Sequence, residues 1–197
     1  MKIFKTITSQ AVPLPLVNID TDQIIPKQFL KLIQKTGFGK FLFYDWRYDS
    51  EGNKKDDFVL NNPKYNNRQI LLTLDNFGSG SSREHAVWAI SDYGFKIIIA
   101  PSFADIFYNN CIKNCVLPII LSKPHIQLLF DNEDIMITVD LEKQQITANS
   151  ITIPFKIDPS SKIYLLEGSD EISKTLKLES EISNYETNHP LYTNISE

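Results

Sequence analysis

A short glycine- and serine-rich segment holds the residues of this chain whose types and spacing best suit chemistry. It reads Asn-Phe-Gly-Ser-Gly-Ser-Ser-Arg-Glu-His-Ala over residues 76–86. Glycines allow the backbone to approach a bound group closely, and an arginine can bind a carboxylate through two parallel hydrogen bonds. We therefore expect this turn to bind an anion, or to hold a serine that its surroundings make reactive.

The elements on either side predict how the turn is held. An apolar run at 70–74 predicts a strand, and a helix is expected over 83–92. A β-branched run at 96–100 predicts a buried parallel strand, followed by a helix over 103–110 and a strand over 116–121. This alternation indicates right-handed βαβ units, with the turn at the N-terminus of the first helix.

The other segments predict a smaller antiparallel part and further helices. The expected elements are strands over 135–140, 145–147 and 150–155, helices over 28–35 and 171–186, and a long polar loop over 45–68. We expect one α/β domain over residues 1–197 with a mixed sheet. Its core would span about residues 2–186, followed by a loose C-terminal tail.

Composition and charge argue against several classes of protein. The net charge is −4 and the pI is near 5.4, which disfavours a broad nucleic-acid-binding surface. No continuous apolar run suits a signal peptide or a membrane span, and the 2 cysteines point to a reducing compartment. We therefore expect a cytoplasmic protein that binds neither nucleic acid nor a membrane.

Common nucleotide-binding and hydrolase motifs do not fit the turn. The spacing begins like the dinucleotide fingerprint G-x-G-x-x-G, but Arg83 stands where the third glycine should be. The Walker pattern and the hydrolase pattern G-x-S-x-G are both absent. A turn that only connects a strand to a helix would explain the glycines, but it would not explain the cluster of Ser81, Ser82 and Arg83.

Three other features have alternative interpretations. The Asp-Thr-Asp sequence at 20–22 suits a helix N-cap or site chemistry, and the pattern alone favours the cap. Cys111 and Cys115 could share a helix face, but two thiols without further ligands are too few for a closed zinc or iron–sulfur site. We expect both cysteines to be buried apolar residues. His85 either orients the turn or packs against neighbouring side chains.

Four segments together resemble one protein family. They cover residues 18–30, 76–86, 92–96 and 100–107, and they include Asn-Ile-Asp-Thr-Asp-Gln-Ile-Ile-Pro and Ala-Pro-Ser-Phe-Ala-Asp-Ile-Phe. Through them the chain resembles the small subunits of 3-isopropylmalate dehydratase, which belong to the aconitase superfamily. The resemblance implies a swivelling β/β/α domain, equivalent to the mobile last domain of aconitase.

The resemblance also implies a reaction and a partner. Such an enzyme interconverts 2-isopropylmalate and 3-isopropylmalate through 2-isopropylmaleate, a step of leucine biosynthesis. The implied partner is a large subunit that carries a [4Fe–4S] cluster on its own cysteines, so this chain would bind a dicarboxylate substrate but no cofactor. An iron of that cluster would act as Lewis acid on the leaving hydroxyl, and neither chain should be active alone.

Site roles follow from the resemblance, residue by residue. Ser81 would be the base that removes a carbon-bound proton, and Ser82 and Arg83 would bind a substrate carboxylate. A serine hydroxyl is a poor base in water, so its alkoxide needs stabilisation from the glycine-rich turn and the helix N-terminus. Arginine is scarce, with only Arg47, Arg68 and Arg83 in the chain, and lysine cannot imitate its two parallel bonds.

Residues outside the turn also receive roles from the resemblance. Asp22 would act near the hydroxyl and water chemistry, while Thr21 and Lys27 would contribute to substrate binding. Gln28 stands where some family members have an arginine, so the second cationic group would be Lys27 or would come from the partner. The segment 159–170 also lacks arginines that the family often carries there.

Two other functions stay open at this stage. One is a sister hydro-lyase that acts on another malate-like acid, such as citramalate or homocitrate. We expect the loop that recognises the side group of the substrate to lie near Pro26–Gly39. The sequence pattern alone does not indicate which residues of this loop contact the side group. The other is a non-catalytic module that binds dicarboxylates and gains no activity from a cluster-bearing partner.

Overall fold

Four parallel strands carry the glycine-rich turn on one edge of their sheet. The computed structural model describes residues 3–30, 36–132, 134–168, 175–176 and 178–189. The strands lie in the order β2 (Ala11–Leu14), β3 (Ile70–Thr73), β4 (Ile97–Ala100) and β5 (Leu117–Ile120). Every pairing between them is parallel, so the loops that follow the strands meet at the same edge.

A second sheet is antiparallel throughout. Its strands lie in the order β1 (Ile7–Ser9), β6 (Ile137–Asp140), β7 (Gln145–Ala148) and β8 (Ile151–Pro154). Buried and part-exposed residues alternate along β6 and β7, which is typical of a sheet that is covered on one face. Only Gln10 separates β1 from β2, so the chain passes directly from this sheet into the parallel one.

Helices and short 3-10 turns connect the strands. The described ones are α1 (Thr21–Ile24), η1 (Lys27–Phe29), η2 (Gly39–Phe41), α2 (Tyr44–Arg47), η3 (Val59–Asn61), η4 (Pro63–Tyr65), α3 (Glu84–Tyr93), α4 (Asp105–Lys113), α5 (Lys123–Phe130), α6 (Pro159–Glu167) and α8 (Glu179–Asn188). Within the described part of the chain, no helix is both long enough and apolar enough to cross a membrane.

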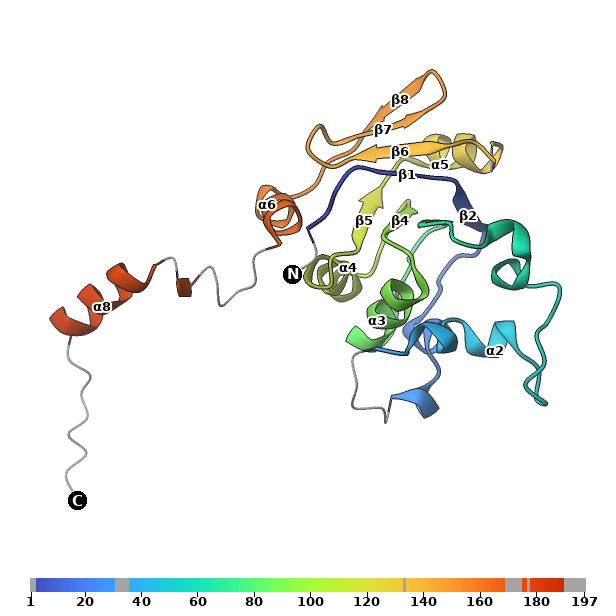
Figure 1. Ribbon diagram of the computed structural model, residues 1–197, viewed down its shortest axis with the longest axis horizontal. Coiled ribbons are helices and arrows are strands. Elements are labelled where there is room, and N and C mark those ends of the chain that lie inside the picture. The colour runs from blue at the N-terminus through green and yellow to red at the C-terminus, as the bar shows by residue number, and fades with distance from the viewer. Residues whose placement is uncertain (1–2, 31–35, 133, 169–174, 177, 190–197) are drawn as a thin grey trace.

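Alternating side chains of the parallel sheet form two cores and three layers. Leu71 and Ile98 pack on one face, in a cluster with buried residues of α3 and α4. Leu72 and Ile99 pack on the opposite face, in a cluster with residues of α5 and the antiparallel sheet. Figure 1 shows the resulting order of antiparallel sheet, parallel sheet and helices. The predicted α/β class with a β/β/α arrangement is confirmed.

The predicted elements next to the turn are confirmed, with boundaries that differ by at most three residues. The parallel and antiparallel strands, however, lie in two sheets rather than in one mixed sheet. The hairpin strands β6, β7 and β8 pair with one another and with β1, whereas the strands of the βαβ units pair among themselves.

Several other segments differ from the prediction. The described part of the helix expected over 28–35 is only the 3-10 turn η1, and residues 31–35 lie outside the described part. The expected polar loop 45–68 contains the short helical turns η3 and η4 and overlaps α2. Helices α5 and α6 differ from the sequence prediction, which contains no helix there. Each has a proline in its first turn, and in the sequence a proline is typical of the end of a helix as well as of its start.

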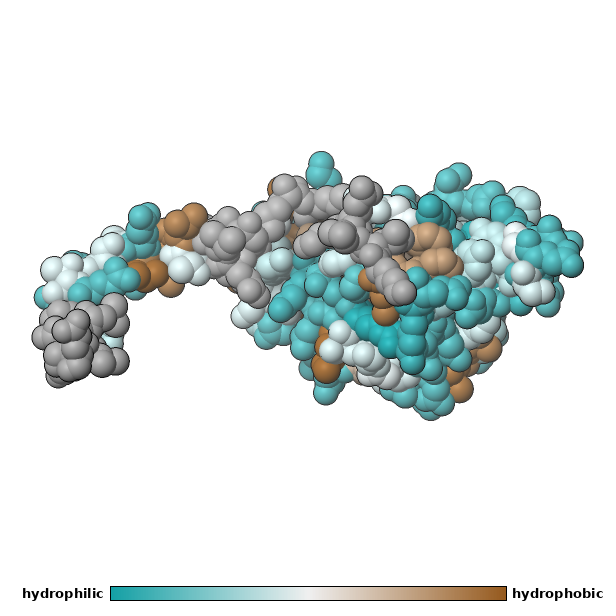
Figure 2. Space-filling view, turned by 90° about the horizontal axis from the view of Figure 1, so that it is seen from below, coloured by the Kyte–Doolittle hydropathy of each residue, from teal (hydrophilic) through white to brown (hydrophobic). Residues whose placement is uncertain are grey.

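The C-terminal helix α8 overlaps the helix predicted over 171–186, although residues 169–174 and 177 lie outside the described part. Helix α8 has no buried residue and lies away from the two sheets (Figure 1). Exposed apolar side chains, including Leu178 and Ile182, lie on this segment, which Figure 2 shows beside a largely hydrophilic body. Residues 190–197 of the expected loose tail are also outside the described part.

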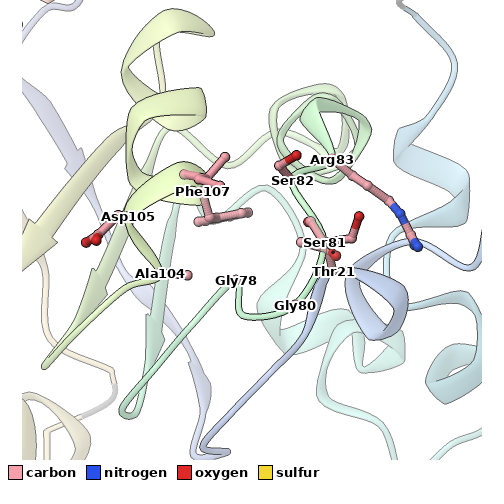
Figure 3. A pocket seen from close by; sticks show the side chains of 10 residues that line it. Thr21, Gly78, Gly80, Ser81, Ser82, Arg83, Ala104, Asp105 and Phe107 are labelled. Atoms are coloured by element: carbon pink, nitrogen blue, oxygen red, sulfur yellow. Dashed lines mark hydrogen bonds between the residues drawn. The ribbon is translucent and has the colours of Figure 1, made fainter.

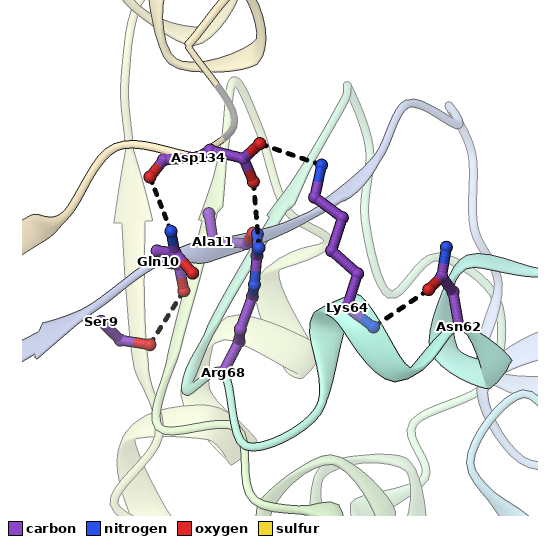
Figure 4. Close-up of polar contacts among 7 residues, drawn as sticks. All are labelled: Ser9, Gln10, Ala11, Asn62, Lys64, Arg68 and Asp134. Atoms are coloured by element: carbon purple, nitrogen blue, oxygen red, sulfur yellow. Dashed lines mark hydrogen bonds and ion pairs between the residues drawn. The ribbon is translucent and has the colours of Figure 1, made fainter.

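A polar cluster joins the two sheets where the chain crosses between them (Figure 4). The carboxylate of Asp134 pairs with Lys64 at 3.0 Å and with Arg68 at 3.1 Å. The buried Arg68 side chain also donates to the Ala11 carbonyl at 2.6 Å, and Gln10 donates its side-chain amide to the Asp134 carbonyl at 2.6 Å. Hydrogen bonds from Lys64 and then Arg68 hold the pKa of Asp134 below its usual value.

Candidate active site

The glycine-rich turn joins β3 to α3 and forms one wall of a pocket (Figure 3). The pocket has a volume of about 220 Å³ and is lined by Thr21, by residues 104–107, and by five residues of the turn, which are Gly78, Gly80, Ser81, Ser82 and Arg83. Both walls follow the carboxyl ends of neighbouring parallel strands, β3 and β4. This is the edge at which open α/β sheets generally bind ligands.

Backbone hydrogen bonds fix the turn between two other segments. Gly78 donates its N–H to the Ile19 carbonyl at 2.8 Å, just before α1. On the other side, Ala104 donates its N–H to the Phe77 carbonyl at 3.1 Å, just before α4. The position of the turn is therefore set relative to both α1 and α4, although the three segments are distant in sequence.

Two glycines of the turn have backbone conformations that other residues rarely adopt. The φ angle is +77° at Gly78 and +87° at Gly80. A Cβ atom added at Gly78 would also overlap the ring of Phe107, which is buried and lies in the first turn of α4. Glycine at position 78 therefore allows the turn to pack directly against the opposite wall of the pocket.

Two serine hydroxyls are presented to the pocket. Ser81 and Ser82 are exposed, and neither hydroxyl makes a hydrogen bond within the described residues. Arg83 is the N-cap of α3 and its side chain makes no capping hydrogen bond. The start of α3 thus keeps the partial positive charge of a helix N-terminus, directly next to both serines.

Arg83 and two residues near α1 form a chain of charges. A nitrogen of the Arg83 guanidinium, Nη1, contacts Oδ1 of Asp22. The other carboxylate oxygen of Asp22 lies 3.4 Å from Nζ of Lys27. Arg83 is 15% exposed, whereas Lys27 is 71% exposed, so the arginine is the better-ordered cation of the two. Two cations share one carboxylate in this chain of charges, and a further carboxylate, that of the exposed Asp105, lines the pocket.

The Asp-Thr-Asp segment supplies the helix N-cap that its pattern favoured and also contacts the glycine-rich turn. Asp20 caps α1, because its carboxylate accepts the N–H of Gln23 at 2.8 Å in a capping box. Asp22 instead points to Arg83. Between them, the buried Thr21 donates its hydroxyl to the carbonyl of Ser81 at 3.0 Å. That hydrogen bond holds the turn in place, so the Thr21 hydroxyl proton is already used within the protein.

The structure therefore brings most of the predicted site residues to one place. Thr21, Ser81, Ser82 and Arg83 line the pocket. Asp22 and Lys27 do not line it but are connected to it through Arg83.

The predicted set of site residues missed the opposite, more apolar wall of the pocket. Ala104, Ile106 and Phe107 lie on this wall, together with the exposed Asp105. They belong to the segment 100–107 that carries part of the family resemblance, but their residue types do not indicate chemistry, and the adjacency of β3 and β4 places them opposite the turn.

Cysteine and histidine side chains have packing roles. Cys111 is fully buried, and burial raises the pKa of its thiol well above the usual value. Cys115 is half-buried, so the expectation of two buried cysteines holds fully only for Cys111. His85 packs against the rings of Phe38 and Trp88, with ring centroids 5.5 Å and 4.6 Å away. No group of three or more metal-ligating side chains occurs among the residues that the structure describes.

Comparisons with known proteins identify the class to which this fold and site belong. The family model of the aconitase C-terminal domain matches residues 1–124, and the LeuD_N model matches residues 126–159. A crystal structure of 3-isopropylmalate dehydratase from Methanocaldococcus jannaschii is similar, with a TM-score of 0.67 and 27% identity. The similarity covers 91% of this chain and 99% of that one. The fold is that of an aconitase C-terminal domain.

Curated relatives identify the family within that class. The 3-isopropylmalate dehydratase small subunit of Parvibaculum lavamentivorans is 52% identical over 94% of this chain and 95% of its own length. The small subunit of Bacillus subtilis is also 52% identical, over 95% and 96% of the two chains. The chain belongs to the family of 3-isopropylmalate dehydratase small subunits, as its motifs indicated. Membership places it in a hydro-lyase of leucine biosynthesis that also has a large subunit.

Proposed function

We propose that the pocket binds 2-isopropylmalate and 3-isopropylmalate, and that the turn supplies a base and a carboxylate-binding group. Dehydration removes a carbon-bound proton and a hydroxyl group as water and gives 2-isopropylmaleate. Addition of water in the opposite sense gives the isomer. The observation that carries this proposal is the presence of two exposed hydroxyls and one guanidinium on the same pocket wall, at a helix N-terminus.

Ser81 is the proposed base. The exposed Ser81 hydroxyl must first release its own proton to solvent water before its oxygen can accept one from carbon, and water alone does not stabilise the resulting alkoxide enough. The N-terminus of α3 and the guanidinium of Arg83 place positive charge in the same turn. Thr21 holds the Ser81 carbonyl and so limits the movement of this residue. These features support the role without an adjacent histidine.

Arg83 and Ser82 are the proposed donors to a substrate carboxylate. A guanidinium presents its N–H groups in a planar fork, which can bind two carboxylates along different edges. Asp22 contacts Nη1, and within the described residues the other donors of Arg83 are not engaged. Lys27 adds a second positive charge next to Asp22. We assign Asp22 to orienting Arg83 and to the hydroxyl and water chemistry near it.

The large subunit is proposed to carry a [4Fe–4S] cluster, which supplies a Lewis acid for the departing hydroxyl when the two subunits are together. The pocket wall on this chain fits the complementary part of the reaction. Its polar side chains can accept a proton and bind carboxylates, and they comprise one cation, three hydroxyls and the carboxylate of Asp105, but neither cysteine nor histidine. We therefore expect activity only from the assembled enzyme.

Anaerobic reconstitution with the large subunit tests this function. We expect the pair to convert 2-isopropylmalate into 3-isopropylmalate, followed through the absorbance of 2-isopropylmaleate, and either chain alone to be inactive. A higher kcat/KM for citramalate or homocitrate would identify a sister hydro-lyase instead. Dicarboxylate binding by the isolated chain, with no activity in the pair, would identify a non-catalytic module.

A further inference from the structure

The pocket has two chemically different walls. One wall consists of the turn, with Ser81, Ser82 and Arg83. The other wall is the start of α4, where Ala104, Ile106 and Phe107 are apolar and Asp105 adds one exposed carboxylate. A substrate that carries both carboxylates and an alkyl group would match this division, because each kind of group would contact a wall of its own polarity.

Ile106 is unusual among the residues of the apolar wall. It is 55% exposed, whereas its neighbour Phe107 is 2% exposed. Single exposed aliphatic residues are normal on protein surfaces and need no function. Ile106, however, lines a hollow that also contains the polar side chains of the turn, so a ligand bound there would cover it.

The backbone fixes Ile106 relative to the polar wall. Phe77 and Phe103 form a parallel β-bridge, and Ala104 donates its N–H to Phe77 at 3.1 Å. The ring of Phe107 also lies directly against Gly78, where no side chain would fit. The first turn of α4 is therefore packed directly against the glycine-rich turn.

We propose that Ile106 is a specificity-determining residue, whose side chain packs with Ala104 and Phe107 against the branched alkyl group of the substrate. This inference rests on the proposed function, because it assumes that the turn binds the carboxylates of an alkylmalate. Binding of the isopropyl group would remove apolar surface of Ile106 from water, which a methyl group would do less completely. Ile106 then favours the larger side group.

The expectation that a specificity loop lies near Pro26–Gly39 stays a prediction, and Ile106 is proposed in addition to it. Residues 31–35 of that segment lie outside the described part of the chain, and its described residues, 26–30 and 36–39, do not line the pocket. The start of α4 does line it, and it follows the strand next to the one that carries Ser81.

The test compares substrates that differ only in the alkyl group. The assembled enzyme is assayed with 2-isopropylmalate and with citramalate, its methyl analogue, for wild type and for Ile106→Ala, Ile106→Val and Ile106→Phe. Ile106→Ala should lower kcat/KM for 2-isopropylmalate by roughly tenfold or more, because it removes an apolar contact in a specificity pocket. Citramalate turnover should change much less, so the ratio of the two constants should fall. Ile106→Phe should lower the same ratio by crowding the larger group.

Ile120→Ala is the matched control. Ile120 is 51% exposed, ends β5 on the same sheet edge and does not line the pocket. In the Ile120→Ala variant, the ratio of kcat/KM for 2-isopropylmalate to kcat/KM for citramalate should equal that of wild type. Equal losses for both substrates in the Ile106 variants would overturn the inference but leave the proposed function intact. Absence of wild-type turnover with any alkylmalate would refute the proposed function itself. If the Ile106→Ala variant does not assemble with the large subunit, the Ile106→Val variant tests the inference through the same ratio of kcat/KM values.

Discussion

The guanidinium of Arg83 contacts the carboxylate of Asp22 between two segments that are 61 residues apart in sequence. Asp22 lies outside the pocket lining and Arg83 lies on it. The carboxylate therefore orients the guanidinium, and a ligand that bound Arg83 would meet a side chain already held by an ion pair. Such preorganisation reduces the entropy that binding must otherwise lose.

Replacement of Arg83 by lysine tests whether substrate binding depends more on the planar geometry of the guanidinium than on its charge. Arg83→Lys keeps a cation but cannot bind Asp22 and a substrate carboxylate in the same planar arrangement. We expect a clear rise in KM for 2-isopropylmalate and a lower kcat/KM in steady-state assays of the assembled enzyme. Wild-type values of KM and kcat in this variant would contradict a bidentate role.

Removal of the Ser81 hydroxyl tests the proposed base. Ser81→Ala should lower kcat by roughly 10²–10⁴, the usual effect of losing a positioned acid or base. Ser79→Ala is the control, because Ser79 belongs to the same turn but does not line the pocket. The control should retain near wild-type kcat, and a similar kcat in both variants would show that Ser81 is not the base.

Thr21 offers a test of how the turn is positioned. Thr21→Val removes the hydroxyl that donates to the Ser81 carbonyl but keeps the shape of the side chain. We expect a loss of about 1 kcal/mol in the free energy of unfolding. We also expect a fall in kcat that exceeds any change in KM. Thr21→Ser should restore both quantities, since it restores the donor. A variant with valine and unchanged kcat would show that this hydrogen bond does not position Ser81.

The Asp134 cluster predicts a pH-dependent contribution to stability. Lys64 and then Arg68 lower the pKa of Asp134 in the folded protein below the ordinary value of 3.8. The folded state therefore favours the ionised carboxylate, and its contribution is present above the unfolded pKa and is lost as pH falls through the folded pKa. The free energy of unfolding, measured by urea titration, should be higher for wild type than for Asp134→Asn at pH near 7.

The same difference should shrink below about pH 4, where the unfolded carboxylate becomes protonated, and should be lost once pH falls through the lowered pKa of folded Asp134. Asp56→Asn provides the control, because Asp56 is an exposed residue of the polar loop. Its unfolding free energy should follow that of wild type throughout. An Asp134→Asn difference that is equally large at pH 3 and pH 7 would contradict the ionic explanation.

Local sequence signals explain which elements could be predicted. The continuous β-branched run of β4 and the helix stop at Gly94 are visible without any knowledge of neighbours. Strand β2 was missed because Pro13 interrupts it. In the structure β2 lies at the edge of the sheet and pairs only with β3, so a missing N–H can be tolerated there. Whether a strand lies at the edge of a sheet depends on the tertiary structure, so the sequence of the strand alone does not predict it.

The same distinction applies to the site. Ser81, Ser82 and Arg83 are adjacent in sequence, so their residue types alone indicated chemistry. The contact of Asp22 with Arg83 depends on how α1 packs against the turn. The place of Ile106 opposite Ser81 depends on β3 and β4 being neighbours. Neither relationship follows from the composition of a single segment.

The contact between Gly78 and Phe107 has an evolutionary consequence. A methyl group at position 78 would overlap the Phe107 ring, and the φ angle of +77° would strain it even if the ring were smaller. A single mutation at position 78 is therefore penalised twice, and a compensating change at position 107 relieves only one of the two penalties. The glycine should consequently be among the slowest positions of the chain to diverge, while position 107 can vary only among side chains that still lie flat against it.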